Sequence, residues 1–442
     1  MGGKSPIVRT YPNGFRLVYE RPSKDLATSH LQVFCHVGSI HEPEDLRGAA
    51  HFIEHMCFKG SSRHPSYKSI NIPFSKTASY FNAETTKQYT HYKVICTEEH
   101  IAEFLEILGD ALLRSKFDRA EYDLEWNVVR EEVIMKTPNS YIENLAFEGT
   151  AYGEWVDHKS YHKKGSLPYE KVVEFYKQYY VPQNMVLSVA SRVAFETICR
   201  YLGKTIFTQN PPGPKITPPI LNPMPPCRAT RGPDDTNYAF HSTSGAVSRV
   251  EIGFDICDQF NMEEYYTLNL LRHIIGSSMS SRLFVELREK LGLTYRSGAE
   301  MVLYEIGGIF VIYAVTDTHR LIRDEKSDGV LPVLFDMVRH LIEHGVGESE
   351  IKWAKERMRE TFNMEQVIGQ EKCAYNGKRI MLHNESDIAT TDSMYSKFYH
   401  HLDKKQVDAI IRKYFSMDRV YLSIFGGKLP AKSAMMKFLS RR

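Results

Sequence analysis

A proline-rich stretch in the middle of the chain limits how the polypeptide can fold. Of the 20 prolines in the 442-residue sequence, nine lie between Gln209 and Pro233. Proline lacks a backbone N–H and fixes φ, so a segment this rich in proline is semi-extended and forms no regular core element. We therefore expect a first domain at residues 1–208, a linker at 209–235 and a second domain at 236–442.

The sequence patterns on the two sides of this linker repeat one another. In each half, segments that alternate like β-strands are interspersed with long amphipathic helical patterns. This repeated order indicates the duplication of one α+β unit. The clearest strand patterns are Phe15–Glu20, Leu31–Val37, Tyr89–Ile95 and Met185–Ala190 in the first half, and Ser248–Asp255, Ile309–Thr316 and Val420–Phe425 in the second.

The first half contains the pattern H-x-x-E-H, formed by His51, Glu54 and His55. No Pro or Gly interrupts residues 49–59, so we expect a helix that stops at Gly60. Side chains three and four residues apart share one face of a helix. Two imidazoles one turn apart can bind one zinc ion, and a carboxylate beside them can take a proton from a metal-bound water. The alternative is a histidine pair that is solvated or packed in a core.

A catalytic zinc needs a third protein ligand, and a second helical pattern offers one. Residues 119–135 are expected to form a helix that carries Glu125 and Glu132. Residues seven apart share a helical face, so Glu125 and Glu132 line up. In the functional interpretation, Glu132 is the third zinc ligand and Glu125 supports it. The alternative is a solvated acidic face, which is common for Glu on a helix. The pattern alone does not show that the two helices meet.

Three other polar residues, judged from the sequence around them alone, could be turn or surface residues without a functional role. Asn82 either lies near the site or is a turn residue. Arg288 and Tyr295 stand where a helical pattern ends and a strand pattern begins, as surface residues often do.

Composition excludes several classes of function. Net charge is +2 and the Lys and Arg residues are scattered, so no basic patch for nucleic acid is expected. No apolar run approaches the roughly 18 to 20 residues that a membrane span needs. The seven Cys are dispersed without a C-x-x-C pair, and residues 1–9 resemble neither a signal peptide nor a transit peptide. We therefore expect neither a nucleic-acid nor a membrane partner, and a cytoplasmic or other reducing intracellular location.

Together these motifs resemble those of the pitrilysin-like (inverzincin) zinc peptidases, in particular the half-size branch with the mitochondrial processing peptidases and their bacterial relatives. The resemblance extends from about Val8 to Phe425. Arg288 and Tyr295 keep the seven-residue offset of the family's substrate-binding Arg and Tyr. The family's signature block resembles Gly38–Pro43 together with Gly48–Gly60. Its carboxylate block resembles Glu125–Glu132, and its active-site strand resembles Asn82-Ala83-Glu84-Thr85.

The resemblance implies an α+β fold with two tandem homologous domains, each a mostly antiparallel sheet packed with helices, that form half of a clamshell. The N-terminal domain would hold one Zn²⁺ per chain through His51, His55 and Glu132, with Glu125 in support. The C-terminal domain would bind no zinc. The residues implied to bind substrate are Asn82, Ala83, Arg288 and Tyr295.

The expected activity is that of a zinc metalloendopeptidase acting on short or unfolded peptides, with a zinc-activated water and Glu54 as general base. The chain has half the length of a closed clamshell, so a homodimer or a heterodimer with a similar chain is implied. Two alternatives stay open. One is a non-catalytic structural or interaction subunit of the same fold, and the other is a catalytic subunit that requires a different partner chain.

Overall fold

The structure, a computed structural model, divides by its internal contacts into two compact units. The first comprises residues 1–137, 155–220 and 361–393, and the second comprises 138–154, 221–360 and 394–442. Two segments thus pack with the unit formed mainly by the other half of the sequence. The continuous domains at 1–208 and 236–442 stay a prediction. The structure describes residues 5–22, 28–135, 141–153, 167–216, 218–228, 237–322, 329–365, 369–383 and 394–429.

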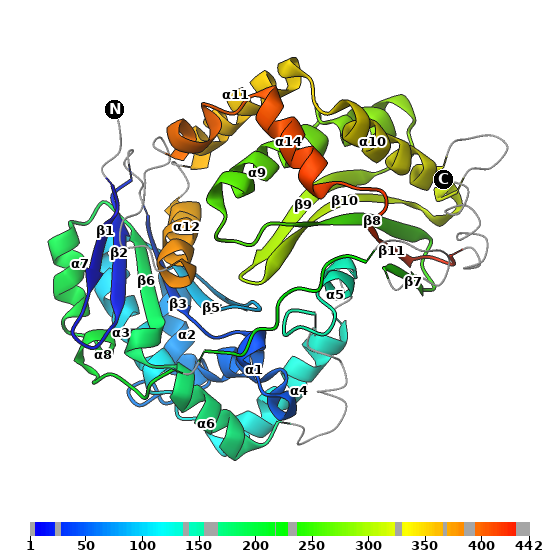
Figure 1. The fold of residues 1–442 in the computed structure, drawn as a ribbon. Coiled ribbons are helices and arrows are strands. Elements are labelled where there is room, and N and C mark those ends of the chain that lie inside the picture. Colours follow the sequence, from blue (N-terminus) through cyan, green and yellow to red (C-terminus); the bar gives the residue numbers. More distant parts are fainter. Residues whose placement is uncertain are drawn as a thin grey trace. The chain divides into compact units, whose positions relative to one another are not determined.

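The first unit is built on a six-stranded sheet with the order β1-β2-β6-β3-β5-β4 (Figure 1). Neighbouring strands run antiparallel except for β2 and β6. The hairpin turn before β2 contains Gly14, whose φ of 84° suits a glycine. The strands are β1 (Ile7–Thr10), β2 (Arg16–Glu20), β3 (Ser29–Cys35), β4 (Tyr80–Thr85), β5 (Thr90–Cys96) and β6 (Met185–Ala190).

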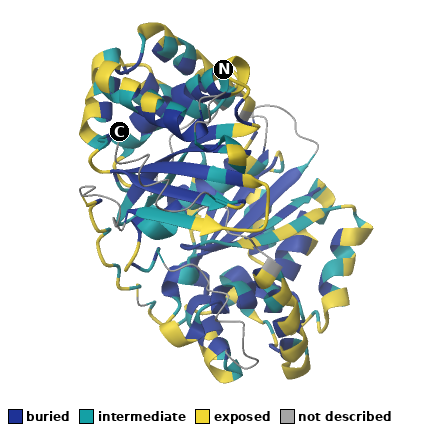
Figure 2. Ribbon diagram, turned by 90° about the vertical axis from the view of Figure 1, so that its right-hand side faces the viewer, coloured by how far each residue is buried: buried dark blue, intermediate teal, exposed yellow. Residues whose placement is uncertain are grey.

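Successive side chains of this sheet point into two different cores, as the two-residue period of a strand requires. Leu31 and Val33 of β3 belong to the large core formed with the helices of the first half. Phe34 packs instead with Ile380 of α12. Most strand residues are therefore buried (Figure 2). The helices are α1 (Ala49–Met56), α2 (Tyr67–Lys76), α3 (Ile101–Leu113), α4 (Arg119–Met135), α6 (Tyr169–Tyr179), α7 (Phe195–Leu202), α8 (Ile206–Gln209) and α12 (Gly369–Leu382).

The second unit is built on a five-stranded sheet with the order β7-β11-β8-β10-β9. Only β7 and β11 run parallel among its neighbouring strands. Its strands are β7 (Tyr238–Ser242), β8 (Val247–Ile256), β9 (Arg296–Tyr304), β10 (Gly307–Asp317) and β11 (Tyr421–Gly426). Its helices are α5 (Ile142–Ala146), α9 (Met262–Gly276), α10 (Val330–His344), α11 (Glu348–Glu365) and α14 (Lys404–Tyr414), with π-helices at Phe284–Lys290 and Tyr395–Tyr399.

The two sheets share one topology. The order β2-β6-β3-β5-β4 corresponds strand by strand to β7-β11-β8-β10-β9, and the single parallel step falls at the same place in both. The predicted α+β class with two homologous, mostly antiparallel units is therefore confirmed. The helix expected at residues 119–135 has those bounds, and the one expected at 49–59 ends at Met56. Within the described residues, no helix combines the length and the apolar character needed to cross a bilayer.

Candidate metal centre

Helix α1 carries the H-x-x-E-H pattern, and Glu42 fixes where the helix begins. The N-cap residue, Gly48, has a φ of 92° and no side chain that could cap the helix. Glu42 supplies the missing acceptor, because its Oε2 accepts from Gly48 N at 2.8 Å and its Oε1 from Ala50 N at 2.7 Å. Burial raises the pKa of Glu42 to about 7, although both N–H groups favour the carboxylate.

Apolar side chains fix the rotation of α1 against its neighbours. Phe52, Ile53 and Met56 are fully buried. The Phe52 ring meets that of Tyr122, at the start of α4, with 4.6 Å between centroids. Side chains of α4 that share the core with Tyr122 include Trp126 and Val129. The two helices are therefore held together by ordinary packing, which positions their polar faces.

The two helices bring His51, His55 and Glu132 together. The Nε2 atom of His51 lies 3.6 Å from Glu132 Oε1, and that of His55 lies 3.4 Å from Glu132 Oε2. One ligand atom from each residue lies within 4.8 Å of the others. Ligand atoms about 2.1 Å from a tetrahedral zinc are themselves about 3.4 Å apart, so two imidazoles and a carboxylate at these distances fit that ion. The Glu132 side chain is 39% exposed, which leaves the centre open to solvent.

Glu125 and Lys59 hold the far side of His55. The Nδ1 atom of His55 lies 2.8 Å from Glu125 Oε1, and the Lys59 ammonium pairs with the other carboxylate oxygen. Burial alone would raise the pKa of Glu125, but the hydrogen bonds from His55 and Lys59 lower it. Burial would likewise lower the pKa of His55, yet its carboxylate neighbours raise it, Glu125 foremost. Glu125 therefore lies within hydrogen-bond distance of His55, and its role in supporting a metal ligand stays a prediction.

Glu54 lies on α1 between the two histidines and is held by strand β4. Its side chain is buried, and its Oε2 accepts a hydrogen bond of 2.6 Å from Thr85 Oγ1. Sequence reasoning missed Lys59 as a residue of the site and missed the contact between Thr85 and Glu54. Lys59 carried a weak signal, because it follows His55 by one helical turn. Thr85 was named only as part of the strand that resembles the family's active-site strand, and its hydrogen bond to Glu54 has no local signal because it depends on the approach of strand and helix.

Strand β4 forms one edge of the six-stranded sheet and contains Asn82 and Ala83. The turn interpretation of Asn82 is therefore wrong. Asn82 is exposed, its Nδ2 donates to Tyr80 OH at 3.0 Å, and Ala83 is half-buried. Glu84 follows on the exposed face, where hydrogen bonds from His91 and Lys93 lower its pKa to about 2.

Comparison with known proteins supports one family along most of the chain. The family model described as Insulinase (Peptidase family M16) matches residues 17–152, which contain His51, Glu54, His55 and Glu132. A second model, described as Peptidase M16 inactive domain, matches residues 166–358. The chain belongs to peptidase family M16. This membership confirms the resemblance to the pitrilysin-like peptidases and, in general terms, the peptidase class.

Several known proteins are similar to this chain over different lengths. An uncharacterised zinc protease of Bacillus subtilis is 27% identical over 414 residues, which is 92% of this chain and 95% of that protein. The mitochondrial-processing peptidase subunit beta of Dictyostelium discoideum is 27% identical over 203 residues, covering 43% of this chain and 41% of that protein. A protease from Helicobacter pylori shares the fold, with a TM-score of 0.83 at 18% identity, over 96% of this chain and all of that one.

Arg288 and Tyr295 lie in the part matched by the M16 inactive domain. Both are exposed, Tyr295 at 83%. Arg288 Nη1 lies 3.4 Å from Tyr295 O, and its guanidinium lies 5.9 Å from the Tyr295 ring centroid. Arg288 belongs to the π-helix Phe284–Lys290, an irregularity often found at functional positions. The two residues thus form a pair, and their role in substrate binding stays a prediction.

Proposed function

We propose that this M16 protein is a zinc metalloendopeptidase that cleaves short or unfolded peptides. The observation that carries the proposal is the convergence of His51, His55 and Glu132, from two helices, on one point. Glu54 lies on the same helix as the two histidines and is buried beside them. A catalytic zinc site needs three protein ligands and an open fourth position, and an adjacent carboxylate can serve as the general base. Zinc protease relatives support the identity of the metal.

The proposed ligands of one Zn²⁺ per chain are His51, His55 and Glu132. When bound, the ion lowers the pKa of water and polarises the scissile carbonyl. Glu54 accepts the proton of the attacking water and passes it to the leaving amine. Thr85 orients Glu54 through the hydrogen bond of 2.6 Å. Glu125 fixes the ring of His55, so that Nε2 remains directed toward Glu132.

The proposed substrate is an extended peptide that pairs with strand β4. An edge strand offers unpaired N–H and C=O groups, and peptides add to such edges as a further strand. Asn82 and Ala83 lie in the middle of β4, three residues or fewer from Thr85. The strand that receives the peptide would therefore also hold the general base. Arg288 and Tyr295 are proposed to bind the same substrate.

We further propose that the chain works as a dimer, either with a second copy or with a similar chain. The support is that relatives are named as subunits, among them a subunit beta of a mitochondrial-processing peptidase. A reducing intracellular location is proposed, since all seven cysteines are free thiols.

The direct test is to incubate the purified chain and one equivalent of zinc with an unstructured peptide, with and without a chelator. Cleavage that the chelator abolishes supports the peptidase. A chain that binds zinc but cleaves only after a second M16 chain is added supports the partner-dependent catalytic subunit. A chain that neither binds zinc nor cleaves supports the structural subunit and contradicts the proposal.

A further inference from the structure

The H-x-x-E-H pattern occurs a second time in the chain, from His340 through Glu343 to His344. This copy lies in the second unit, in the last turns of helix α10. It qualifies the expectation of a C-terminal domain that binds no zinc. We propose that His340 and His344 form a second metal site, a two-histidine chelate for borderline divalent ions such as Zn²⁺ and Ni²⁺.

The two imidazoles already lie side by side on the surface. Both residues are exposed, and their ring centroids are 4.4 Å apart with 25° between the ring planes. Because His340 and His344 are one turn apart on a helix, each can supply one ring nitrogen to the same ion. Imidazole suits Zn²⁺, Cu²⁺ and Ni²⁺, whereas Mg²⁺ prefers oxygen ligands. The histidine pair should therefore bind Zn²⁺, Cu²⁺ or Ni²⁺ in preference to Mg²⁺.

A backbone contact prepares His344 to act as a ligand. Its Nδ1 atom lies 3.2 Å from the carbonyl oxygen of His340. With the proton on Nδ1, His344 donates to this carbonyl, and Nε2 keeps the lone pair that a metal needs. Metal-binding histidines commonly donate their other ring N–H to a backbone carbonyl or a carboxylate in this way.

The electrostatic surroundings of the pair favour a cation. The last turn of a helix carries the partial negative charge of its free carbonyl groups. Glu343 adds a carboxylate whose Oε2 lies 4.0 Å from His344 Nδ1. The nearest basic residue in the sequence, Arg339, is paired with Asp336 at 3.2 Å. A bound divalent ion would thus meet attraction from both the helix and the carboxylate.

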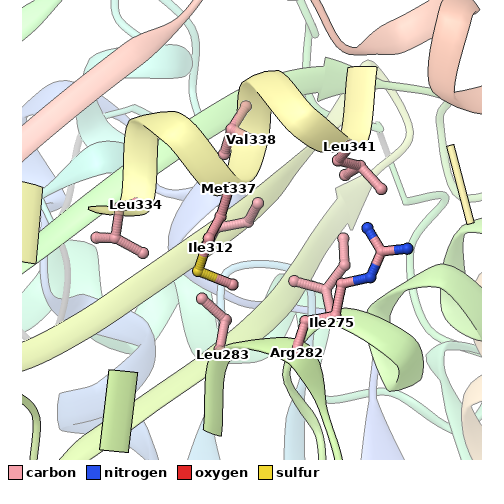
Figure 3. A pocket seen from close by; sticks show the side chains of 8 residues that line it. All are labelled: Ile275, Arg282, Leu283, Ile312, Leu334, Met337, Val338 and Leu341. Atoms are coloured by element: carbon pink, nitrogen blue, oxygen red, sulfur yellow. The ribbon is translucent and has the colours of Figure 1, made fainter. Parts of the chain in front are cut away.

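The end of α10 is a fixed platform for these residues. Leu334, Val338 and Leu341 line an apolar pocket with Ile275, Leu283 and Ile312 (Figure 3). The Arg282 guanidinium at the pocket rim donates to Gly345 O at 3.0 Å and to Glu350 Oε1 at 2.7 Å. Gly345, whose φ of 69° is left-handed, directly follows the helix. The apolar packing of α10 and the hydrogen bond from Arg282 to Gly345 therefore hold the helix end that carries the two histidines.

The second site must bind metal more weakly than the first. Among the described residues, only His51, His55 and Glu132 form a group of three potential ligands. A site with two imidazole ligands leaves more positions to water, and the Glu343 carboxylate lies beside the pair without being one of its proposed ligands. The chain should therefore bind zinc with two different affinities, one for each site.

Calorimetric titration of the metal-free full chain with Zn²⁺ tests this site. We expect wild type to bind about two equivalents in two affinity classes. His340→Gln/His344→Gln should lose the weaker class and keep the tighter one. The matched control is His400→Gln/His401→Gln, which removes two exposed histidines that are adjacent and do not share a helical face; it should keep both classes.

Two further measurements separate this site from the first. His51→Gln/His55→Gln should keep the weaker class, and Ni²⁺ but not Mg²⁺ should occupy it. Binding of a single equivalent by wild type, or a second equivalent that survives His340→Gln/His344→Gln, would overturn the proposal. Loss of the second equivalent in the His400→Gln/His401→Gln control would equally contradict it.

Discussion

The Nδ1 atom of His55 lies 2.8 Å from Oε1 of Glu125, a residue 70 positions further along the chain. This contact ties α1 to α4 without involving the nitrogen of His55 that faces Glu132. Lys59 neutralises the remaining charge of the Glu125 carboxylate. The arrangement therefore holds His55, a proposed zinc ligand, in position without a metal, which would lower the free-energy cost of binding the ion.

Glu125→Gln should weaken zinc binding by about 10- to 100-fold, because the amide cannot hold both His55 and Lys59 as the carboxylate does. Competition against a chromophoric chelator measures the change. Glu131→Gln is the control, since Glu131 is exposed on the same helix and pairs with its neighbour Arg130. Equal affinities of the two variants would contradict the supporting role of Glu125.

Glu54→Gln should keep about one equivalent of tightly bound zinc, and its rate of peptide hydrolysis should fall by about 100- to 10,000-fold. The amide has nearly the shape of the carboxylate but cannot accept a proton. Metal analysis and cleavage of a fluorogenic unstructured peptide give the two readouts. Full activity in this variant would reject the general-base assignment.

Thr85→Val should lower kcat by about 10- to 100-fold with little change in KM or zinc content, because a hydrogen bond to a charged group contributes about 1.5–3 kcal/mol. Thr85→Ser keeps the hydroxyl and should restore most of the rate. If Ser and Val were equally impaired, the effect would come from packing of β4 and not from the bond to Glu54.

The loop that leads into α1 should be sensitive to acid. Burial lowers the pKa of His41 to about 3 and that of His36 to about 4, whereas a histidine in the unfolded chain has a pKa of about 6.5. Below that value the unfolded chain binds protons that the folded chain excludes. Stability is therefore lost as pH falls from about 6.5 toward the folded pKa values, by about 1.4 kcal/mol per pH unit for each group.

His41→Asn tests this expectation, because an Asn oxygen can still accept from Gly38 N, as His41 Nδ1 does at 3.1 Å. Denaturant midpoints at pH 5 and pH 7 should differ less in this variant than in wild type. His319→Asn, at an exposed position, should leave the difference unchanged. A steeper dependence in His41→Asn would show that the histidine is charged in the folded state.

The periodicity of α1 and α4 could be predicted because it is local. The spacing of Glu125 and Glu132 places them on one helical face, and the structure shows both at the site. That these helices converge depends on packing between residues far apart in sequence, such as Phe52 and Tyr122. Only the family resemblance suggested the convergence.

Other features lacked a local signal. Strand β4 alternates between exposed and half-buried residues and has few apolar side chains, so its sequence gives only a weak signal for a strand. The amphipathic pattern of α12 predicts a helix but not the sheet that it covers. Gly377 marks the close approach of this helix to β3, since a Cβ there would lie 2.2 Å from Phe34 Cε2. Such a glycine is recognised only once the partner strand is known.

Anomalous diffraction at the zinc edge, from crystals of the full chain with about one equivalent of Zn²⁺, would show whether α1 and α4 bind the ion. We predict a dominant anomalous peak about 2.0–2.2 Å from Nε2 of His51, Nε2 of His55 and a carboxylate oxygen of Glu132. A map without an anomalous peak between these side chains, or with zinc bound to the histidines while Glu132 points elsewhere, would contradict the proposed zinc site.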